Sequence, residues 1–324
     1  MSPYKPFIEI NRAKDEAPQA GTAEAKSPSA KSPFPTSLDQ DLETKTAAFA
    51  LEAEALSVGY PGCAPVISDL SFGLQRGRVL AVIGPNGSGK TTLFRALAGE
   101  LPLSAGRVLV RAQRDCLDIH RLPARAKARL ITRVLQNEQS AWAVPVSDYV
   151  QAGLFAAEGW FSHDPARAAK KTAWALEAMG ISILSKRPVT ELSGGEFRRV
   201  VIARALVQDT DILLLDEPTA DLDLEHQMET LELLLDLAKT GKAVAFSVHD
   251  LNQAAMVADQ VLLLAEGKAA AFGKPSEVLT VEIIGQTYRS RVFVGKHPAA
   301  DIPQIVPNPG WMERVSAKRR GTDS

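Results

Sequence analysis

The chain has 324 residues with 45% hydrophobic content, enough for one large or two modest domains around a sizeable core. Its formal net charge is −1, so no global basic field argues for nucleic acid as a partner, and no run of about eighteen apolar residues predicts a membrane span. Cys63 and Cys116 lie far apart and form no C-x-x-C pair, which favours free thiols in a reducing compartment over a disulfide framework or a zinc site.

The composition of the chain changes near residue 48. Residues 1–48 are rich in Ala, Pro, Ser, Lys and Glu, and they cannot bury enough apolar surface to offset the entropy of ordering. They also lack the apolar core of a secretory signal, so we expect a mostly disordered extension. A strand is predicted at 49–58, where Leu51, Ala53 and Ala55 alternate with two glutamates.

A phosphate-binding loop follows the apolar run 79–83. It has the pattern G-x-x-x-x-G-K-T and leads into a helix-like segment that starts with Thr92. The glycines let successive backbone N–H groups point at one phosphate beside the positive end of the helix. The lysine adds charge for the β- and γ-phosphates, and the threonine offers a hydroxyl to Mg²⁺. The loop comprises Gly84, Pro85, Asn86, Gly87, Ser88, Gly89, Lys90 and Thr91.

The stretch between residues 136 and 192 is typical of helices. Asp164 is placed to cap a helix whose first turn contains Pro165, and an alanine-rich periodic pattern continues to Gly180. We therefore expect a small helical subdomain at about 137–190. Three aromatic side chains in it either fill a core or mark a partner surface, and both interpretations stay open. They are Trp142, Trp160 and Phe161.

A second anion-binding turn is predicted at 192–196. Ser193 can cap the helix-like segment that follows, and the double glycine frees backbone amides at the helix start. One nucleotide does not need two such turns from one subunit. The residues of this turn are Ser193, Gly194, Gly195 and Glu196.

Two adjacent acids end the apolar run 212–215, which Asp211 precedes. A run without polar alternation is typical of a parallel strand buried on both faces, whose carboxyl end opens beside the phosphate loop. We expect Asp216 to face the metal and Glu217 to face the attacking water, because neighbouring side chains on a strand point in opposite directions. A strand capped by acidic turn residues is the alternative, which the phosphate loop disfavours.

Three further residues are ambiguous when taken singly. Tyr60 alone would be a turn aromatic, Gln136 a polar strand end, and His249 a satisfied strand-terminal histidine. Their order along one chain with the motifs above favours a functional interpretation. His249 follows the apolar run 243–248, so we expect it at the same carboxyl edge as Asp216.

Together, the ordered motifs resemble those of the ATP-binding cassette ATPases over roughly residues 49–307. In that family the turn at Ser193 closes over the γ-phosphate bound by the phosphate loop of a second subunit, so the resemblance implies a homodimer with two ATP sites. Tyr60 matches the family's adenine-stacking aromatic, Gln136 its metal- and water-sensing glutamine, and His249 its γ-phosphate histidine. Asp223 belongs to the segment that matches the dimer-crossing loop.

The resemblance also implies an architecture. We expect an α/β cassette with a parallel core sheet around the phosphate loop, an antiparallel β edge and the α-helical subdomain. The ATP-binding domain is placed at 49–285, a short C-terminal extension at 286–310, and a basic tail at 311–324. We interpret that tail as a solvated terminus rather than a lipid contact, because its charges are few. Glu196, where the family most often has glutamine, is interpreted as a tolerated variant.

The segments 223–227, 249–254 and 275–307 are similar to the ATPases of importers for iron chelates, haem and cobalamin. This implies an ATP-hydrolysing subunit, with Mg²⁺, that powers uptake through a separate membrane permease fed by a substrate-binding protein. It would lie on the cytoplasmic face of the membrane through that permease. The alternatives are an importer ATPase for zinc, manganese or molybdate, and a soluble cassette ATPase outside transport. The second is disfavoured because coiled-coil insertions, tandem cassettes and basic surfaces are not visible.

Overall fold

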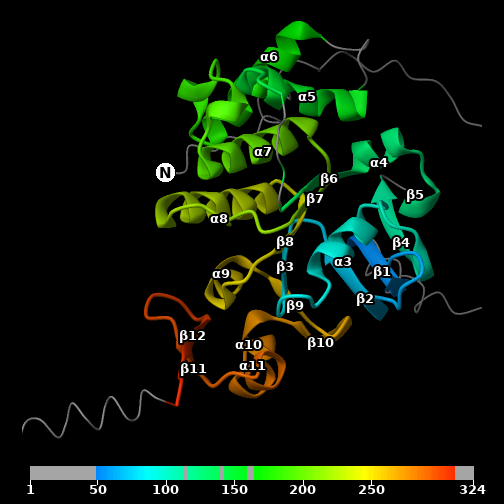
Figure 1. The fold of residues 1–324 in the computed structure, drawn as a ribbon, viewed down its shortest axis with the longest axis vertical. Helices are drawn as coiled ribbons and strands as arrows, with labels where there is room; N and C mark the ends of the chain where they lie inside the picture. Colours follow the sequence, from blue (N-terminus) through cyan, green and yellow to red (C-terminus); the bar gives the residue numbers. More distant parts are fainter. Residues whose placement is uncertain (1–48, 113–114, 137, 139–141, 159–163, 311–324) are drawn as a thin grey trace, which may run out of the picture.

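The computed structural model describes residues 49–112, 115–136, 138, 142–158 and 164–310. A six-stranded sheet forms the centre of the molecule (Figure 1). Five of its strands are parallel, and one edge strand, β10, runs antiparallel to its neighbour β9. In spatial order the strands are β10 (Lys268–Gly273), β9 (Gln260–Ala265), β3 (Val79–Ile83), β8 (Ala243–Ser247), β7 (Ile212–Leu215) and β6 (Ile131–Val134).

The parallel strands are buried on both faces, as their unbroken apolar runs predict. Along β3, Leu80 and Val82 enter one hydrophobic core, whereas Val79, Ala81 and Ile83 enter a second core on the opposite face. The same alternation divides the side chains of β7, β8 and β9. Because both faces are covered, the polar groups at the carboxyl ends of these strands gather at one edge.

An antiparallel sheet and helix α3 cover the first of these faces. The sheet has the order β2 (Ile67–Gln75), β1 (Phe49–Val58), β4 (Leu103–Ala112) and β5 (Asp115–Asp118), and α3 spans Lys90–Leu97. The strand predicted at 49–58 is present, but its expected alternation is wrong at Ala55, which is exposed. The register shifts there and Ala55 has a φ of 46°, so a β-bulge turns this residue outward.

Helices cover the opposite face. Near the sheet lie α8 (Leu224–Lys239) and α9 (Leu251–Val257), and α5, α6 and α7 pack against one another at the top of the view in Figure 1. Asp164 caps α6, as predicted, and accepts a hydrogen bond from the Ala166 amide at 2.9 Å. The remaining elements are α4 (Ala124–Leu130), α5 (Val146–Glu158), α6 (Pro165–Ala178), α7 (Gly194–Gln208) and the 3-10 turns Ile119–Arg121, Ser182–Leu184 and Val189–Glu191.

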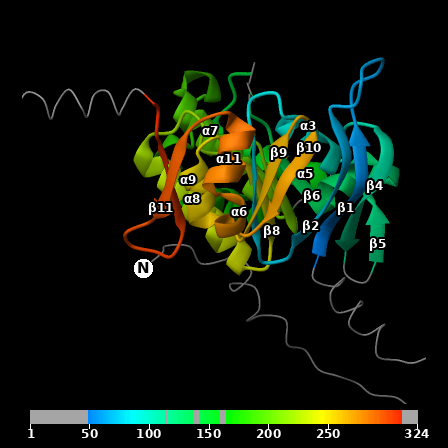
Figure 2. The same cartoon turned by 90° about the horizontal axis from the view of Figure 1, so that it is seen from below.

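The C-terminal part forms a small unit beside β9 and α9. It comprises α10 (Pro275–Val278), α11 (Val281–Tyr288) and a hairpin of β11 (Val292–Lys296) and β12 (Pro303–Pro307) (Figure 2). The side-chain amide of Asn252 in α9 donates to the Ile305 carbonyl at 3.1 Å and accepts from the Ile305 amide at 2.8 Å. This pair fastens the hairpin to α9.

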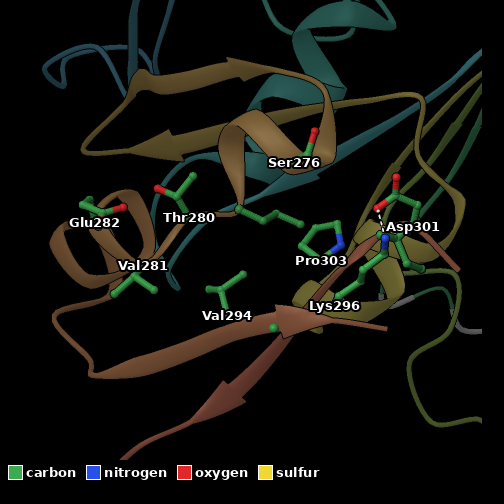
Figure 3. Close-up of a pocket in the computed structure, with 11 residues that line it drawn as sticks. Ser276, Thr280, Val281, Glu282, Val294, Lys296, Asp301 and Pro303 are labelled. Atoms are coloured by element: carbon green, nitrogen blue, oxygen red, sulfur yellow. Dashed lines mark ion pairs between the residues drawn. The ribbon is translucent and has the colours of Figure 1, made fainter. Parts of the chain in front are cut away.

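A pocket of about 390 Å³ lies between α10, α11 and the hairpin (Figure 3). An ion pair between Lys296 and Asp301, at 2.9 Å, stands at one side of it. Both of these side chains are mostly exposed, and none of the nucleotide-site residues predicted from the sequence lines this pocket. The pocket is therefore a separate surface feature.

Several expectations concern chain termini, thiols and membrane spans. Residues 1–48, Trp160, Phe161 and the tail 311–324 lie outside the described residues. Cys63 and Cys116 are exposed free thiols, as predicted. Within the described ranges, every helix is too short or too polar to cross a bilayer.

Candidate nucleotide-binding site

At two positions of the loop between β3 and α3, the backbone has a conformation that favours glycine. Gly84 has a φ of 151°, and a Cβ there would lie 2.3 Å from the carbonyl oxygen of Leu264. Gly89 has a φ of 102° and forms the N-cap of α3. No side chain caps this helix, so its first amides and its positive end face the loop. The loop is thus shaped for an anion, as the sequence predicts.

Lys90 lies beneath the same loop. Its side chain is buried, and its ammonium donates to the Gly84 carbonyl at 2.8 Å. Burial lowers the pKa of Lys90, while the charges of Glu217 and Asp216 act in the opposite direction. The hydroxyl of Ser88 is buried and has no hydrogen-bond partner. A phosphate oxygen is the kind of acceptor that suits both the ammonium and this hydroxyl.

Asp216 and Glu217 follow β7 rather than ending it. The expected strand alternation is therefore not what separates them: β7 stops at Leu215, and Glu217 has a left-handed φ of 51°. Asp216 is completely buried and its Oδ1 accepts from the Ser247 hydroxyl at 2.5 Å, while Oδ2 has no partner. A turn rather than the pleat sends the two carboxylates in different directions.

Two of the predicted residues contact the carboxylate of a third. Gln136 donates its Nε2 proton to Glu217 Oε2 at 2.7 Å, and His249 Nε2 lies 2.6 Å from Glu217 Oε1. These residues come from the loops after β6, β7 and β8, which are neighbouring parallel strands. The structure therefore brings Gln136 and His249 to Glu217, at the shared carboxyl edge that their positions predict.

A groove of about 580 Å³ opens between this cluster and the phosphate loop. Tyr60 stands at its wall, 39% exposed, and its hydroxyl accepts from Arg95 Nη1 at 3.2 Å. A hydrogen bond with Thr92 and another with Arg95 lower the pKa of Tyr60. The groove is lined by Tyr60, Val66, Asn86, Gly87, Ser88, Gly89, Lys90, Thr91, Thr92, Gln136, Glu217 and His249.

The second predicted turn is built but lies outside this groove. Ser193 caps α7 by accepting from the Glu196 amide at 3.3 Å, and the Glu196 carboxylate accepts from the Ser193 amide at 2.8 Å. Gly194, the first residue of α7, lines a different groove, of about 410 Å³. Asp223 caps α8 by accepting from the His226 amide at 3.0 Å. One chain therefore does not bring these residues to its own phosphate loop.

Two residues of the site were not predicted. Ser247 accepts from the Glu217 amide at 2.9 Å and donates to Asp216, so it holds both acids. Its polarity at the end of the apolar strand β8 is the signal that could have identified it. Arg198 lies buried beneath the acids, and its signal is a cation two residues before the apolar run 200–203 of α7.

Oxygen atoms suited to Mg²⁺ lie beside the groove. The unpartnered Oδ2 of Asp216 is a buried acceptor, and the hydroxyl of Thr91 and the side-chain oxygen of Gln136 are of the same hard donor type. These three residues fit the ion that the sequence implies.

Comparison with known proteins agrees with these features. Residues 67–220 match the family model described as ABC transporter. The chain is 38% identical, over 78% of its length, to the cobalamin import ATP-binding protein of Halobacterium salinarum, and it spans 61% of the length of that relative. It is 37% identical to the hemin import ATP-binding protein of Thermobifida fusca, covering 79% of this chain and 88% of that one.

A solved structure assigned to a metal-chelate type ABC transporter in an inward-facing conformation has the same fold. Its TM-score is 0.69 at 30% identity, with 82% of this chain and 99% of that chain covered. The expected fold class, an α/β cassette of this family, is confirmed, and both relatives above are named as ATP-binding proteins. The chain belongs to the ABC transporter family.

Proposed function

We propose that the protein hydrolyses ATP as the cassette subunit of an importer. The observation that carries this proposal is the convergence of Gln136, Glu217 and His249 across the groove from the phosphate loop. The two contacts hold the Glu217 carboxylate at a fixed position beside the groove, and a general base must lie within hydrogen-bond reach of the proton that it receives.

Each residue of the site has a role that follows from its chemistry. The loop amides and Lys90 bind the phosphates, and Tyr60 presents a ring for the adenine base. Glu217 accepts a proton from the attacking water, and His249 donates a hydrogen bond to the γ-phosphate when that group takes the place of its present partner. Mg²⁺, held by Thr91, Gln136 and Asp216, would neutralise charge on the phosphates.

The turn at Ser193 supports a homodimer in which each chain completes the site of the other. Ser193 and Gly194 line a separate groove rather than the groove beside this chain's own phosphate loop. Ser193, Gly194 and Gly195 would then contact the γ-phosphate bound to the partner, and Asp223 with its neighbours would line the subunit boundary. Such a two-fold arrangement gives two identical sites per dimer.

The cargo and the further partners follow from the relatives. The two relatives compared above import cobalamin and hemin, and the related solved structure belongs to the metal-chelate type. We propose the same class of cargo: an iron-siderophore, haem or cobalamin type compound. A membrane permease would hold the dimer on the cytoplasmic face of the membrane, and a substrate-binding protein would deliver the cargo.

The catalytic part is tested by Glu217→Gln, which keeps the shape and the hydrogen bond to His249 but removes the base. Hydrolysis should fall by about 10² to 10⁴-fold, since a positioned general base contributes that much. ATP affinity measured by calorimetry should stay unchanged. Undiminished hydrolysis in this variant would contradict the role of Glu217 as the general base.

The transport part is tested by co-expression with a candidate permease. The protein should sediment with membranes only when the permease is present, and its ATPase rate should respond to the loaded binding protein. A protein that stays in the soluble fraction beside every candidate permease, with an unresponsive ATPase rate, would support the non-transport alternative instead.

A further inference from the structure

The guanidinium of Arg198 touches both loops that carry the reacting side chains. Its Nη1 donates to the carbonyls of Leu135 and Gln136, the second at 3.2 Å. Its Nη2 donates to the carbonyls of Asp216 and Glu217, the second at 2.6 Å. One side chain on α7 therefore joins the main chain after β6 to the main chain after β7.

The surroundings of Arg198 are unusual for a buried cation. Its side chain is 6% exposed, its Nε has no partner, and its four hydrogen bonds all go to main-chain carbonyls rather than to a carboxylate. Burial lowers the pKa of Arg198, and the charge of Asp216 is the largest influence in the other direction. A buried charge of this kind is weak evidence for added stability, because apolar side chains of similar volume often serve as well. Its geometric effect is the more informative property.

That geometric effect falls on the two residues that meet in the groove. The backbone of Glu217 is left-handed, its amide donates to Ser247, and its carbonyl accepts from Arg198. The backbone of Gln136 accepts from the same guanidinium, so the 2.7 Å bond between the Gln136 and Glu217 side chains spans two loops held by one group.

A second arginine of α7 holds the chain beyond Gln136. Arg204 pairs with the Glu138 carboxylate and donates to the Tyr149 hydroxyl at 2.9 Å, and Tyr149 donates to Glu138 at 2.7 Å. The two arginines thus fix the chain on both sides of Gln136 to α7. This helix also begins with the turn at Ser193, about one and a half turns before Arg198.

We propose that Arg198 is a positioning residue for ATP hydrolysis. It holds the main chain of Gln136 and Glu217 at a fixed position relative to α7. The proposal rests on the proposed function and deepens it. Because the turn at Ser193 belongs to the same rigid helix, a shift of α7 when the dimer closes would be passed directly to the water-activating carboxylate. Arg198 lines the groove at Ser193 and Gly194 but not the groove beside its own chain's phosphate loop, so we expect it to act on the rate rather than on ATP binding by that loop.

The test replaces Arg198 by methionine and by lysine in the full-length protein. Arg198→Met removes all four bonds, and kcat should fall by about 10²-fold, because small misplacements of reacting groups have effects of that size. Arg198→Lys should show a smaller loss, since an ammonium can reach some but not all of the carbonyls. The affinity for ATP, measured by calorimetry, should stay within about threefold, because the phosphate loop is untouched.

A matched control is Arg76→Met. Arg76 also donates to a main-chain carbonyl, that of Arg111 at 2.8 Å, and pairs with Asp211 at the opposite end of β7. This variant should keep the wild-type kcat. In addition, Arg198→Met combined with Glu217→Gln should lower single-turnover hydrolysis no further than Glu217→Gln alone, because a base that is absent cannot be misplaced.

Three kinetic or binding results would overturn the proposal. They are an unchanged kcat in folded Arg198→Met, a parallel loss of ATP affinity and kcat, or losses that multiply in the double variant. Failure of both Arg198 variants to fold, measured by thermal unfolding, would also overturn it, since the residue would then serve stability as a whole. If the unaltered protein hydrolyses no ATP at all, the proposed function fails instead. Measuring hydrolysis by the unaltered protein therefore distinguishes the two failures.

Discussion

The two anion-binding turns of this chain are built by opposite means. The turn at Gly84 is enclosed: its backbone conformation is open only to glycine, and a Cβ would strike the carbonyl of Leu264. The turn at Gly194 is open, because a Cβ there would meet nothing within 4 Å. The first glycine is required by the fold of the chain that contains it. The second is not.

This difference indicates where each turn finds its ligand. A glycine that its own chain does not need is explained by something that approaches from outside, and a nucleotide held by a second subunit is such an approach. The phosphate loop is therefore a property of the monomer, whereas the turn at Ser193 would gain its ligand in the dimer that we propose.

The sharpest test of this comparison is a methyl group added to each glycine. Gly84→Ala should lower the free energy of unfolding by about 3 kcal/mol or more, because it combines a glycine-only backbone with a clash against main chain. Gly194→Ala should leave stability unchanged or raise it by up to about 1 kcal/mol, since alanine suits an exposed helix start better than glycine. Urea unfolding of the two variants measures both effects.

The variants Gly84→Ala and Gly194→Ala also distinguish effects on stability from effects on activity. Gly194→Ala should fold normally, bind ATP and yet hydrolyse it at least about tenfold more slowly, because the methyl group enters the space of the partner's phosphate. A fully active Gly194→Ala variant, or equal losses of stability at both positions, would contradict the contrast between the two turns.

A smaller but more specific effect is expected from mixed dimers. Ser193→Arg should spare stability and ATP binding but block hydrolysis, because it places a bulky charge in the shared turn. Lys90→Ala should instead weaken ATP binding, since it removes a charge-assisted contact to the phosphates. Mixing the two variants should restore one intact composite site in each mixed dimer, measured by nucleotide trapping. A mixture with no intact site would argue against sharing between subunits.

The smallest effect concerns pH. Hydrogen bonding by the Ser193 amide, above all, lowers the pKa of Glu196. A carboxyl whose pKa is depressed on folding stabilises the native state above its unfolded pKa, about 4.3, and loses this contribution as the pH falls through the folded value. Glu196→Gln keeps the capping bond without the titration, so the stability difference between the two proteins should shrink below about pH 4. A constant difference down to pH 3 would contradict this assignment.

Patterns of local chemistry made much of the molecule predictable. The buried runs of β3 and β7, the cap at Asp164 and the glycine-dependent turn into α3 all depend on neighbours in sequence, and the structure confirms them. Glu196 in place of glutamine also has a local explanation, since either side chain completes the same capping box with Ser193.

Features that depend on distant residues were not predictable in this way. Ala55 leaves the predicted alternation because the register with a neighbouring strand shifts. The separation of Asp216 from Glu217 comes from a left-handed turn whose amide is held by Ser247. Arg198 finds its acceptors on two loops that only the sheet order brings together. None of these has a signature within a short window of sequence.

The bond between Asn252 and Ile305 has a consequence for how this sequence can change over time. The side-chain amide of Asn252 both donates and accepts, as the main chain of a neighbouring strand would do. An aspartate at this position would offer the Ile305 carbonyl only another acceptor. The requirement at position 252 is thus imposed by a hairpin 53 residues later, although the neighbouring His249 contacts Glu217 beside the groove. We expect relatives without the hairpin to accept any good helix former at 252, whereas chains that keep the hairpin should keep the amide.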